Sequence, residues 1–315
     1  MTETATIPIV PDHELIRLIG SGSSGQVWLA KNALGSFRAV KIVQEQVFKH
    51  RRPFEREFNG ILKFEPVSRL HDGLVDILQV GRNEAAGYFY CVMELADDVV
   101  TGSNILPATY SPRTLEQDID RLKRLPVAEC VRLGAAIASA LGFLHRHGLF
   151  HRDIKPSNII FVGGMPKLAD IGLVTDALEG RSFVGTEGFR APEGSGTIRA
   201  DIYALGKVLY EISTGKDRNE YPALPEFTGS HAETRDLILL NKIILKACRA
   251  RAWQRYQTAE EMMLALLAFQ FNKAALRNKE NTELLTKVFA IIGALAALGI
   301  FGGAVWRFIW LLNHK

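Results

Sequence analysis

The chain has 315 residues, 47% of them hydrophobic, and a formal net charge of +4 at pH 7. This length suggests about two domains or one large two-lobed domain, and the charge surplus is too small to indicate a nucleic-acid partner. The three cysteines share no close spacing, so neither a disulfide framework nor a zinc motif is predicted and a reducing compartment fits best. The N-terminal residues contain no basic region followed by an apolar one, so no signal peptide is expected.

Residues 13–95 alternate short β-rich runs with turns, after an N-terminal extension at 1–12. The runs are ELIRLIG, QVWLAKN, FRAVKIV, LVDILQVG and YFYCVMEL. One segment between them, FEREFNGILKF, has the pattern of an amphipathic helix. This part of the chain therefore predicts an antiparallel sheet that carries one helix.

From about residue 114 the pattern becomes helical. Residues 127–148 carry apolar side chains at helical spacing and end at a glycine, and further helices are predicted at 201–215 and 258–269. A mainly helical part is therefore expected to follow the sheet. The stretch 97–113 between the two parts looks like an inserted loop, and its sequence does not indicate a function.

The stretch LFHRDIKPSNIIF, at 149–161, places charged and amide side chains between two apolar runs. Its His-Arg-Asp, followed after four residues by Asn, matches the protein-kinase catalytic loop, in which the Asp faces the substrate hydroxyl and the Asn binds Mg²⁺. By itself this pattern also fits coincidence or a buried ion network, so the neighbouring motifs decide the interpretation.

Further motifs stand in the order that kinase chemistry requires. GSGSSGQV, at 20–27, fits G-x-G-x-x-G-x-V, and the strand RAVKIV that follows contains Lys41. LADIGL contains Asp170, and Ala-Pro-Glu occupies 191–193. Over about 15–269 the chain resembles the eukaryotic-like (Hanks-type) Ser/Thr protein kinases, a family also widespread in bacteria.

The resemblance implies an α+β, bilobal protein-kinase fold. The smaller lobe, an antiparallel sheet with one main helix, is expected at about 13–95, and the larger, mainly helical lobe at about 96–270. The resemblance also implies ATP as the nucleotide, Mg²⁺ as the ion with Mn²⁺ as an alternative, and Ser and Thr hydroxyls of proteins as acceptors.

Lys41 is expected to contact the α- and β-phosphates and to need an acidic partner on the helix. The family pattern points to Glu57, and Glu55, on a different face of the helix, is the alternative. Glycines let a backbone fold over a triphosphate without Cβ clashes, a role that the resemblance gives to Gly20, Gly22 and Gly25. The adenine slot implied by the resemblance comprises Val27, Ala39, Met93, Glu94, Ala96 and Ile160.

The same resemblance assigns roles in and after the catalytic loop. Asp153 accepts or orients the hydroxyl proton of the acceptor, and Lys155 steadies the transferred phosphate. Asn158 and Asp170 supply oxygen ligands for Mg²⁺, which prefers oxygen donors. The residue after Asp170 is Ile171 where the family usually has Phe, so the apolar plug is kept and its aromatic contacts are lost.

The activation segment is expected at 170–193. Arg152, beside the catalytic Asp, is the kind of residue that pairs with a phosphate. The candidate phosphoacceptors are Thr175, Ser182 and Thr186. Thr186 also resembles the threonine that contacts the catalytic Asp and Lys, so Ser182 is at least as good a regulatory candidate.

Two more residues receive structural roles from the resemblance. Asp201 is expected to anchor the backbone of the catalytic loop, and Arg255 to pair with Glu193. Two interpretations of the whole domain stay open, an active Ser/Thr kinase and a nucleotide-binding pseudokinase scaffold. The complete set of catalytic residues favours the enzyme. A small-molecule kinase is a weaker third option, against which the Ala-Pro-Glu segment and Thr186 argue.

The segment VFAIIGALAALGIFGGAVW, at 288–306, contains no charged residue. As a helix it would span about 30 Å, the thickness of the hydrocarbon core of a bilayer. We therefore predict a single transmembrane helix with a short tail at 288–312, joined to the kinase domain by a juxtamembrane linker at 271–287. More basic residues precede this segment than follow it, which predicts a single-pass membrane protein with its kinase domain in the cytoplasm. Gly299 and Gly303 form a G-x-x-x-G spacing of the kind that packs two spans in a homodimer.

Overall fold

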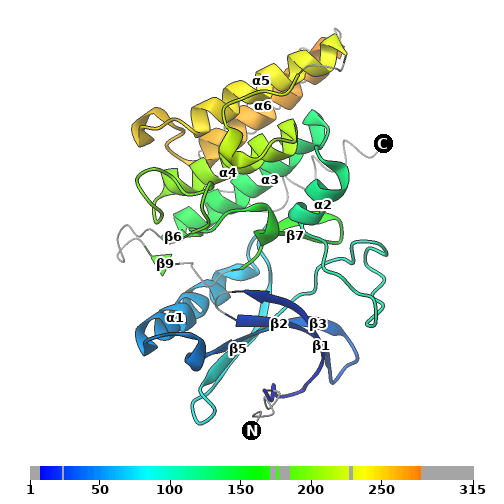
Figure 1. The fold of residues 1–315 in the computed structure, drawn as a ribbon, viewed down its shortest axis with the longest axis vertical. Helices are drawn as coiled ribbons and strands as arrows, with labels where there is room; N and C mark the ends of the chain where they lie inside the picture. The colour runs from blue at the N-terminus through cyan, green and yellow to red at the C-terminus, as the bar shows by residue number, and fades with distance from the viewer. Residues whose placement is uncertain (1–7, 23–24, 171–174, 177–184, 227–229, 278–315) are drawn as a thin grey trace.

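The computed structural model describes residues 8–22, 25–170, 175–176, 185–226 and 230–277. The chain forms a small lobe built on a sheet and a larger lobe built from helices, and the two lobes stack along the long axis of the molecule (Figure 1). The predicted bilobal α+β architecture is confirmed.

The small lobe is a five-stranded antiparallel sheet with the strand order β1-β2-β3-β5-β4. Its strands are β1 (His13–Gly22), β2 (Gly25–Asn32), β3 (Phe37–Gln44), β4 (Ile77–Asn83) and β5 (Tyr88–Met93). The central strand β3 buries five successive residues, as expected for a strand covered on both faces. A side chain on β3 is therefore held in a nearly dry environment.

One long helix, α1 (Arg51–Ser68), packs beside the sheet (Figure 1). Its buried face includes Phe54, Glu57, Ile61 and Phe64, which are spaced three or four residues apart and so lie on one side of the helix. The Phe54 ring meets the ring of Phe89 on β5 at a centroid distance of 5.1 Å. This spacing puts one carboxylate, that of Glu57, on the face turned toward the sheet.

The large lobe surrounds the apolar helix α3, which packs against α4 and α6. Its helices are α2 (Leu115–Leu122), α3 (Val127–Arg146), α4 (Ile198–Thr214), α5 (His231–Ala247) and α6 (Ala259–Arg277). Among the described residues, the short 3₁₀ turns are η1 (Glu45–Val47), in the small lobe, and η2 (Pro156–Asn158), η5 (Arg218–Glu220) and η6 (Ala252–Gln254), in the large lobe. Helices α2 and α5 were not predicted, although each begins with a capping box, Thr114 with Gln117 and Ser230 with Glu233.

Two small strand pairs face the junction of the lobes, β6 (Leu149–Phe150) with β9 (Thr175–Asp176) and β7 (Ile159–Val162) with β8 (Met165–Leu168). The catalytic-loop motif lies between β6 and β7. Because β6 and β7 are short and buried, they fix both ends of that loop.

Within the described part of the chain, α3 is the one helix long and apolar enough to cross a membrane. It is mostly buried as the core helix of the large lobe. The predicted span, its glycine pair and most of the linker before it lie outside the described residues. The predicted domain boundary at residue 270 falls inside α6, which continues to Arg277.

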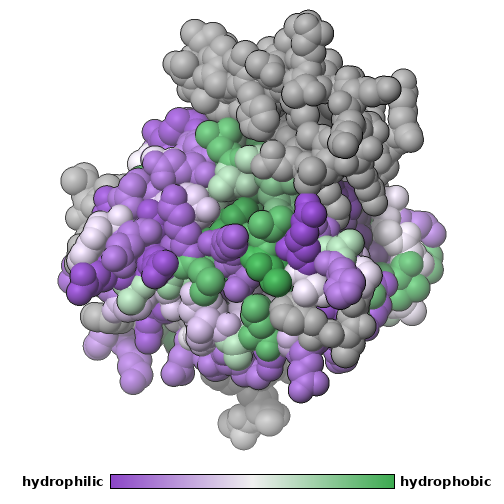
Figure 2. Space-filling view, turned by 90° about the horizontal axis from the view of Figure 1, so that it is seen from above, coloured by the Kyte–Doolittle hydropathy of each residue, from purple (hydrophilic) through white to green (hydrophobic). Residues whose placement is uncertain are grey.

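Seen from the end formed by α5 and α6, the surface is mainly hydrophilic with a narrow hydrophobic strip (Figure 2). Among the side chains that the structure describes on these two helices, the most exposed large apolar ones are Ile238, Leu239 and Leu264, at 42%, 37% and 37%. Exposure of this size is ordinary for the surface of a folded protein.

Candidate active site

Lys41 lies on β3, where it pairs in register with Val27 on β2 and with Cys91 on β5. Its side chain is 10% exposed, and its Nζ lies 3.0 Å from Glu57 Oε1 and 2.8 Å from Asp170 Oδ1. The cation therefore joins the sheet, helix α1 and the first residue of the predicted activation segment.

The charges of this cluster stabilise one another. Burial alone would lower the pKa of Lys41, but the carboxylates of Asp170 and Glu57 outweigh it and raise that pKa above its ordinary value. The same lysine lowers the pKa of Asp170, against the opposing effect of burial. The lysine and this aspartate are therefore both ionised at neutral pH.

Of the two acidic candidates on α1, Glu57 is the one that contacts Lys41. Glu55 accepts two hydrogen bonds from Arg82 on β4, at 2.6 and 2.8 Å, and one from Arg51 at 2.9 Å. These bonds, chiefly that of Arg82, lower the pKa of Glu55 to about 2. Glu55 thus belongs to a partly exposed surface network that ties α1 to β4.

The glycine motif covers the end of β1 and the start of β2. Gly22 and Gly25 face each other as the last pair of that ladder, and Gly20 pairs with Val27. A Cβ at Gly25 would collide with the carbonyl oxygen of Ile42, so only glycine fits the close approach to β3.

The predicted adenine-slot residues gather where the sheet meets β7. Ala39 and Met93 are paired across β3 and β5, and Ile160 lies on β7. The connection that follows β5 is tied to β7, because the backbone N–H of Asp97 donates to Phe161 O at 2.7 Å. The structure thereby brings this set, with Glu94 and Ala96, to one side of the lobe junction.

Glu94 has a contact that the sequence did not indicate. Its carboxylate accepts hydrogen bonds from Lys167 Nζ on β8, at 2.5 Å, and from the backbone of Asp76, at 2.8 Å. Burial raises the pKa of Glu94, and the lysine opposes part of that rise. The side chain of Glu94 is thus part of the scaffold, and its backbone N–H donates to Asp76 O at 3.1 Å, so its carbonyl oxygen is the group that remains for a nucleotide.

The inserted loop 97–113 is folded around the buried carboxylate of Asp98, which accepts hydrogen bonds from the backbone N–H groups of Val100, Thr101 and Ser111, each at 2.8 Å. Arg17 on β1 donates to the carbonyl oxygens of Pro107, at 2.8 Å, and Tyr110. The loop therefore connects the segment after β5 directly to the strand that leads into the glycine motif.

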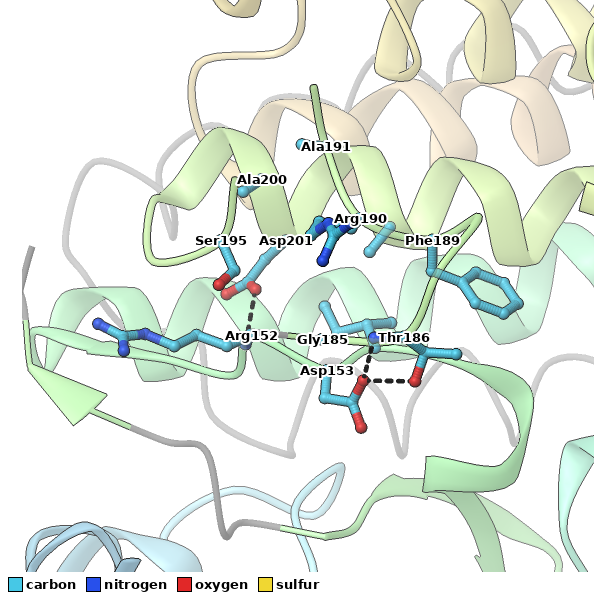
Figure 3. A pocket seen from close by; sticks show the side chains of 12 residues that line it. Arg152, Asp153, Gly185, Thr186, Phe189, Arg190, Ala191, Ser195, Ala200 and Asp201 are labelled. Carbon is cyan, nitrogen blue, oxygen red and sulfur yellow. Dashed lines mark hydrogen bonds between the residues drawn. The ribbon is translucent and has the colours of Figure 1, made fainter. Parts of the chain in front are cut away.

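The predicted catalytic loop is organised by Asp201, which lies in the first turn of α4. Its carboxylate accepts a hydrogen bond from the backbone N–H of Arg152, at 2.9 Å (Figure 3). It also accepts one from the backbone N–H of His151, at 3.0 Å, and lies 3.0 Å from His145 Nε2. Arg152 has a positive φ of 68°, a strained conformation that persists where surrounding contacts hold it.

Asp153 faces Thr186 across the catalytic loop (Figure 3). Its Oδ1 accepts hydrogen bonds from the backbone N–H of Thr186, at 3.0 Å, and from the Thr186 hydroxyl, at 2.8 Å. Lys155 Nζ lies 2.9 Å from Asp153 Oδ2 and donates to Thr186 Oγ1 at 3.0 Å. An acid, a cation and a hydroxyl thus form one compact cluster.

Asn158 and Asp170 fit the oxygen donors of an Mg²⁺ site. The Asn158 amide nitrogen donates to Asp153 O, at 2.8 Å, and to Asp153 Oδ2, at 3.0 Å, so its Oδ1 is the atom that remains for an ion. Asp170 uses Oδ1 for Lys41 and is 43% exposed. The described residues contain no group of three or more His, Cys, Asp or Glu able to hold a metal, so phosphate and water oxygens would have to complete the coordination.

A family model described as protein kinase domain matches residues 13–287. The chain belongs to the protein kinase family. Over 219 residues, the chain is 31% identical to one curated relative, the DNA damage-responsive serine/threonine-protein kinase RqkA of Deinococcus radiodurans. It is 29% identical over 309 residues to the serine/threonine-protein kinase PrkC of Bacillus subtilis. These alignments cover 64% and 89% of the kinase but only 30% and 44% of the two relatives.

The kinase also has the expected contact between Ala-Pro-Glu and the end of the lobe. Arg255, whose side chain is 0% exposed, donates two hydrogen bonds to the carboxylate of Glu193, at 2.7 and 2.8 Å. Three backbone carbonyls, those of Arg199, Arg249 and Ala250, accept its remaining hydrogen bonds. The pair fastens the end of the activation segment to the helical lobe.

The predicted phosphoacceptors of the kinase are only partly described. Thr175 lies in β9 and pairs with Phe150, and Ser182 lies outside the described residues. Thr186 belongs to the cluster around Asp153. Arg152 is buried. The regulatory roles of all four remain predictions.

Proposed function

We propose that this kinase transfers the γ-phosphoryl group of ATP to Ser and Thr hydroxyls of proteins. The observation that carries the proposal is the cluster of Asp153, Lys155 and Thr186, which offers a carboxylate and a cation at one place. The names of the relatives, serine/threonine-protein kinases, support the same activity. Because the chain spans less than half the length of those two relatives, this activity is a proposal for the present protein.

Each residue of the site has a definite task in that reaction. Lys41, fixed by Glu57, holds the phosphates, and Asp153 orients the acceptor hydroxyl and takes its proton. Lys155 balances the charge that spreads over the transferred phosphoryl group. Asn158 and Asp170 would hold Mg²⁺ or Mn²⁺, and the bound ion would neutralise part of the phosphate charge.

A pseudokinase scaffold is the competing function. It would bind ATP without transfer, and such scaffolds often lack part of the catalytic set. Here Lys41, Asp153, Asn158 and Asp170 are all present, and the first three are buried. This completeness favours an enzyme.

The test uses the full chain, γ-labelled ATP and a degenerate library of Ser- and Thr-containing peptides. We expect transfer by the wild type and a loss on the order of 10²- to 10⁴-fold in Asp153→Asn, with ATP binding retained. Asp72→Asn, at an exposed aspartate, is the matched control. ATP binding without transfer by the wild type would establish the scaffold instead.

Autophosphorylation of the activation segment is part of the proposal. It is supported by the position of Arg152 beside Asp153 and by the acceptors Thr175, Ser182 and Thr186 along the segment. Mass spectrometry of active protein should find phosphate between 175 and 186. Active protein without phosphate there would exclude this form of regulation.

The membrane anchor is also part of the proposal and rests on the sequence of 288–312. A single span there, with the kinase domain in the cytoplasm, accounts for the uncharged run and the basic residues before it. Full-length protein should stay in the pellet after an alkaline carbonate wash, and a chain ending after Arg277, the last residue of α6, should not. Release of the full-length protein would exclude the span and the dimer through Gly299 and Gly303.

A further inference from the structure

A groove of about 460 Å³ lies beside the predicted catalytic loop. Lys155 and Thr186, from the cluster around Asp153, line one part of it, and Phe189, Glu211 and Arg218 line another. Because the groove reaches two residues that contact Asp153, we infer that an acceptor side chain approaches through it. What shapes the wall of the groove then also shapes that approach.

Arg218, the first residue of η5, makes four kinds of contact around this wall. Its backbone N–H donates to Glu211 Oε1 at 3.0 Å, and its Nη1 donates to the same oxygen at 3.1 Å. Its Nε donates to the carbonyl oxygen of Glu187 at 3.3 Å, and its guanidinium lies 4.7 Å from the centre of the Phe189 ring. One side chain thus joins α4, through Glu211, to the segment that follows Thr186.

That segment, 186–189, is a tight turn closed by a hydrogen bond of 3.3 Å from the Phe189 N–H to Thr186 O. Gly188 in the turn has a φ of +83°, and a Cβ there would lie 2.8 Å from Arg218 Cδ. The turn is therefore packed directly against the arginine. At its other end Thr186 holds Asp153 and Lys155, so the turn stands between Arg218 and the acid of the site.

The anchor on the α4 side is equally well fixed. Glu211 is only 7% exposed, and burial of an unpaired carboxylate would be costly. Lys207, one turn earlier on α4, donates to the carbonyl oxygen of Arg218 at 2.5 Å. Both the backbone and the side chain of Arg218 are thus held by α4.

We propose that Arg218 is a positioning residue for phosphoryl transfer. It holds the turn 186–189 against α4, and through Thr186 it keeps Asp153 and Lys155 in the geometry that the acceptor hydroxyl requires. This proposal rests on the proposed kinase activity. It assigns a role in the acceptor half of the reaction to a residue outside all the motifs of the sequence.

The test compares steady-state kinetics of the full-length protein and its variants, with an acceptor peptide selected from the library by the wild type. Arg218→Met keeps the aliphatic stem and removes the guanidinium. We expect kcat for the peptide to fall on the order of 10- to 100-fold, because a small displacement of a catalytic group has effects of that size. The KM for ATP should stay close to wild type, whereas the melting temperature should fall because Glu211 loses its guanidinium partner.

Two conservative variants separate positioning from folding. Arg218→Lys keeps the charge but has no planar fork to reach Glu211 and Glu187 together, so it should not restore kcat. Glu211→Gln keeps the shape of the anchor and should show the same selective loss even if Arg218→Met does not fold. Arg235→Met, at an exposed arginine on α5, is the matched control and should behave as wild type.

The outcomes distinguish the two proposals. A wild type without transfer contradicts the kinase activity itself. An active wild type with unchanged kcat in Arg218→Met, or in Glu211→Gln where the first variant is unfolded, contradicts the positioning role. A kcat restored by Arg218→Lys, or a loss of ATP affinity as large as the loss of kcat, contradicts it too and leaves a structural role.

Discussion

Two buried ion pairs of this kinase look alike and are built differently. Arg255 meets Glu193 and three carbonyl groups, all within the helical lobe, and its side chain is 0% exposed. Lys41 bridges the sheet, α1 and Asp170, and the carboxylate of Asp170 is 43% exposed. The guanidinium of the first pair is enclosed, although Glu193 is 19% exposed, whereas the second cluster opens to water at Asp170.

The difference indicates what each pair is for. A planar guanidinium whose donors are all used by neighbours can only fasten them together. A lysine is a compact charge with three rotatable donors, and a ligand can compete for it. Burial of an ion pair therefore does not by itself distinguish a structural role from a binding role. The number of hydrogen-bond donors that remain for a ligand distinguishes them.

The largest effect is expected from breaking the enclosed pair. Arg255→Met should lower the free energy of unfolding by about 3–5 kcal/mol, because it strands the carboxylate of Glu193. Urea denaturation measures this loss. Arg69→Met, at an exposed pair with Glu65, is the control and should cost no more than about 1 kcal/mol. A loss of that small size in Arg255→Met would remove the contrast between the two pairs.

Breaking the cluster of Lys41, Glu57 and Asp170 should chiefly lower the rate of phosphoryl transfer. We expect Lys41→Met to lower phosphoryl transfer on the order of 10²- to 10³-fold, since a preorganised charge opposite the phosphates is lost. Its urea midpoint should also fall, because the variant removes the cation that faces the carboxylate of Glu57, which is 5% exposed. Unchanged transfer would reduce Lys41 to a strand residue.

Two neighbouring glutamates sharpen the comparison. Glu57→Gln should lower transfer on the order of 10- to 100-fold because Lys41 loses its partner on α1. Glu55→Gln touches only the network of Arg82 and Arg51 and should leave transfer unchanged. Assays of phosphoryl transfer by the two variants, run side by side, test this difference. Equal losses of transfer would show that general weakening of α1 is the cause.

The smallest effect concerns pH. Burial lowers the pKa of His71 from 6.5 to about 4, whereas Lys41 keeps its charge throughout that range. Between pH 6.5 and 4 the unfolded chain binds a proton that the folded chain does not, so stability falls as the pH is lowered through that window. His71 should account for about 3 kcal/mol of this fall.

His71→Gln tests this assignment. Urea midpoints measured from pH 7 to pH 4 should fall less steeply in the variant than in the wild type. Parallel curves would mean that other groups, and not His71, carry the pH dependence.

Much of the site could be read from local sequence. The five strands of the small lobe, α1, and the order of the motifs were predicted from spacing alone, and the three- and four-residue spacing around Phe54 explains why Glu57 faces the sheet. Helix α5 was missed although Ser230 and Glu233 form a capping box, so its signal was available.

Other contacts have no local signal. His145 is 56 residues before Asp201 and meets it only because α3 and α4 pack together. Arg218 and the turn 186–189 are likewise joined by the fold. Tertiary pairing of this kind depends on how helices dock, and the periodicity of one segment does not contain that information.

Helix α3 has a consequence for biosynthesis. By length and composition it resembles a membrane-spanning helix, and what distinguishes it is burial against α4 and α6. Both of those helices follow it in the chain, so a ribosome exposes 127–146 before its cover exists. Cellular machinery that recognises long apolar segments would meet this helix first. The speed with which the later helices dock, and not only the final stability of the lobe, therefore determines whether the newly made chain is sorted correctly.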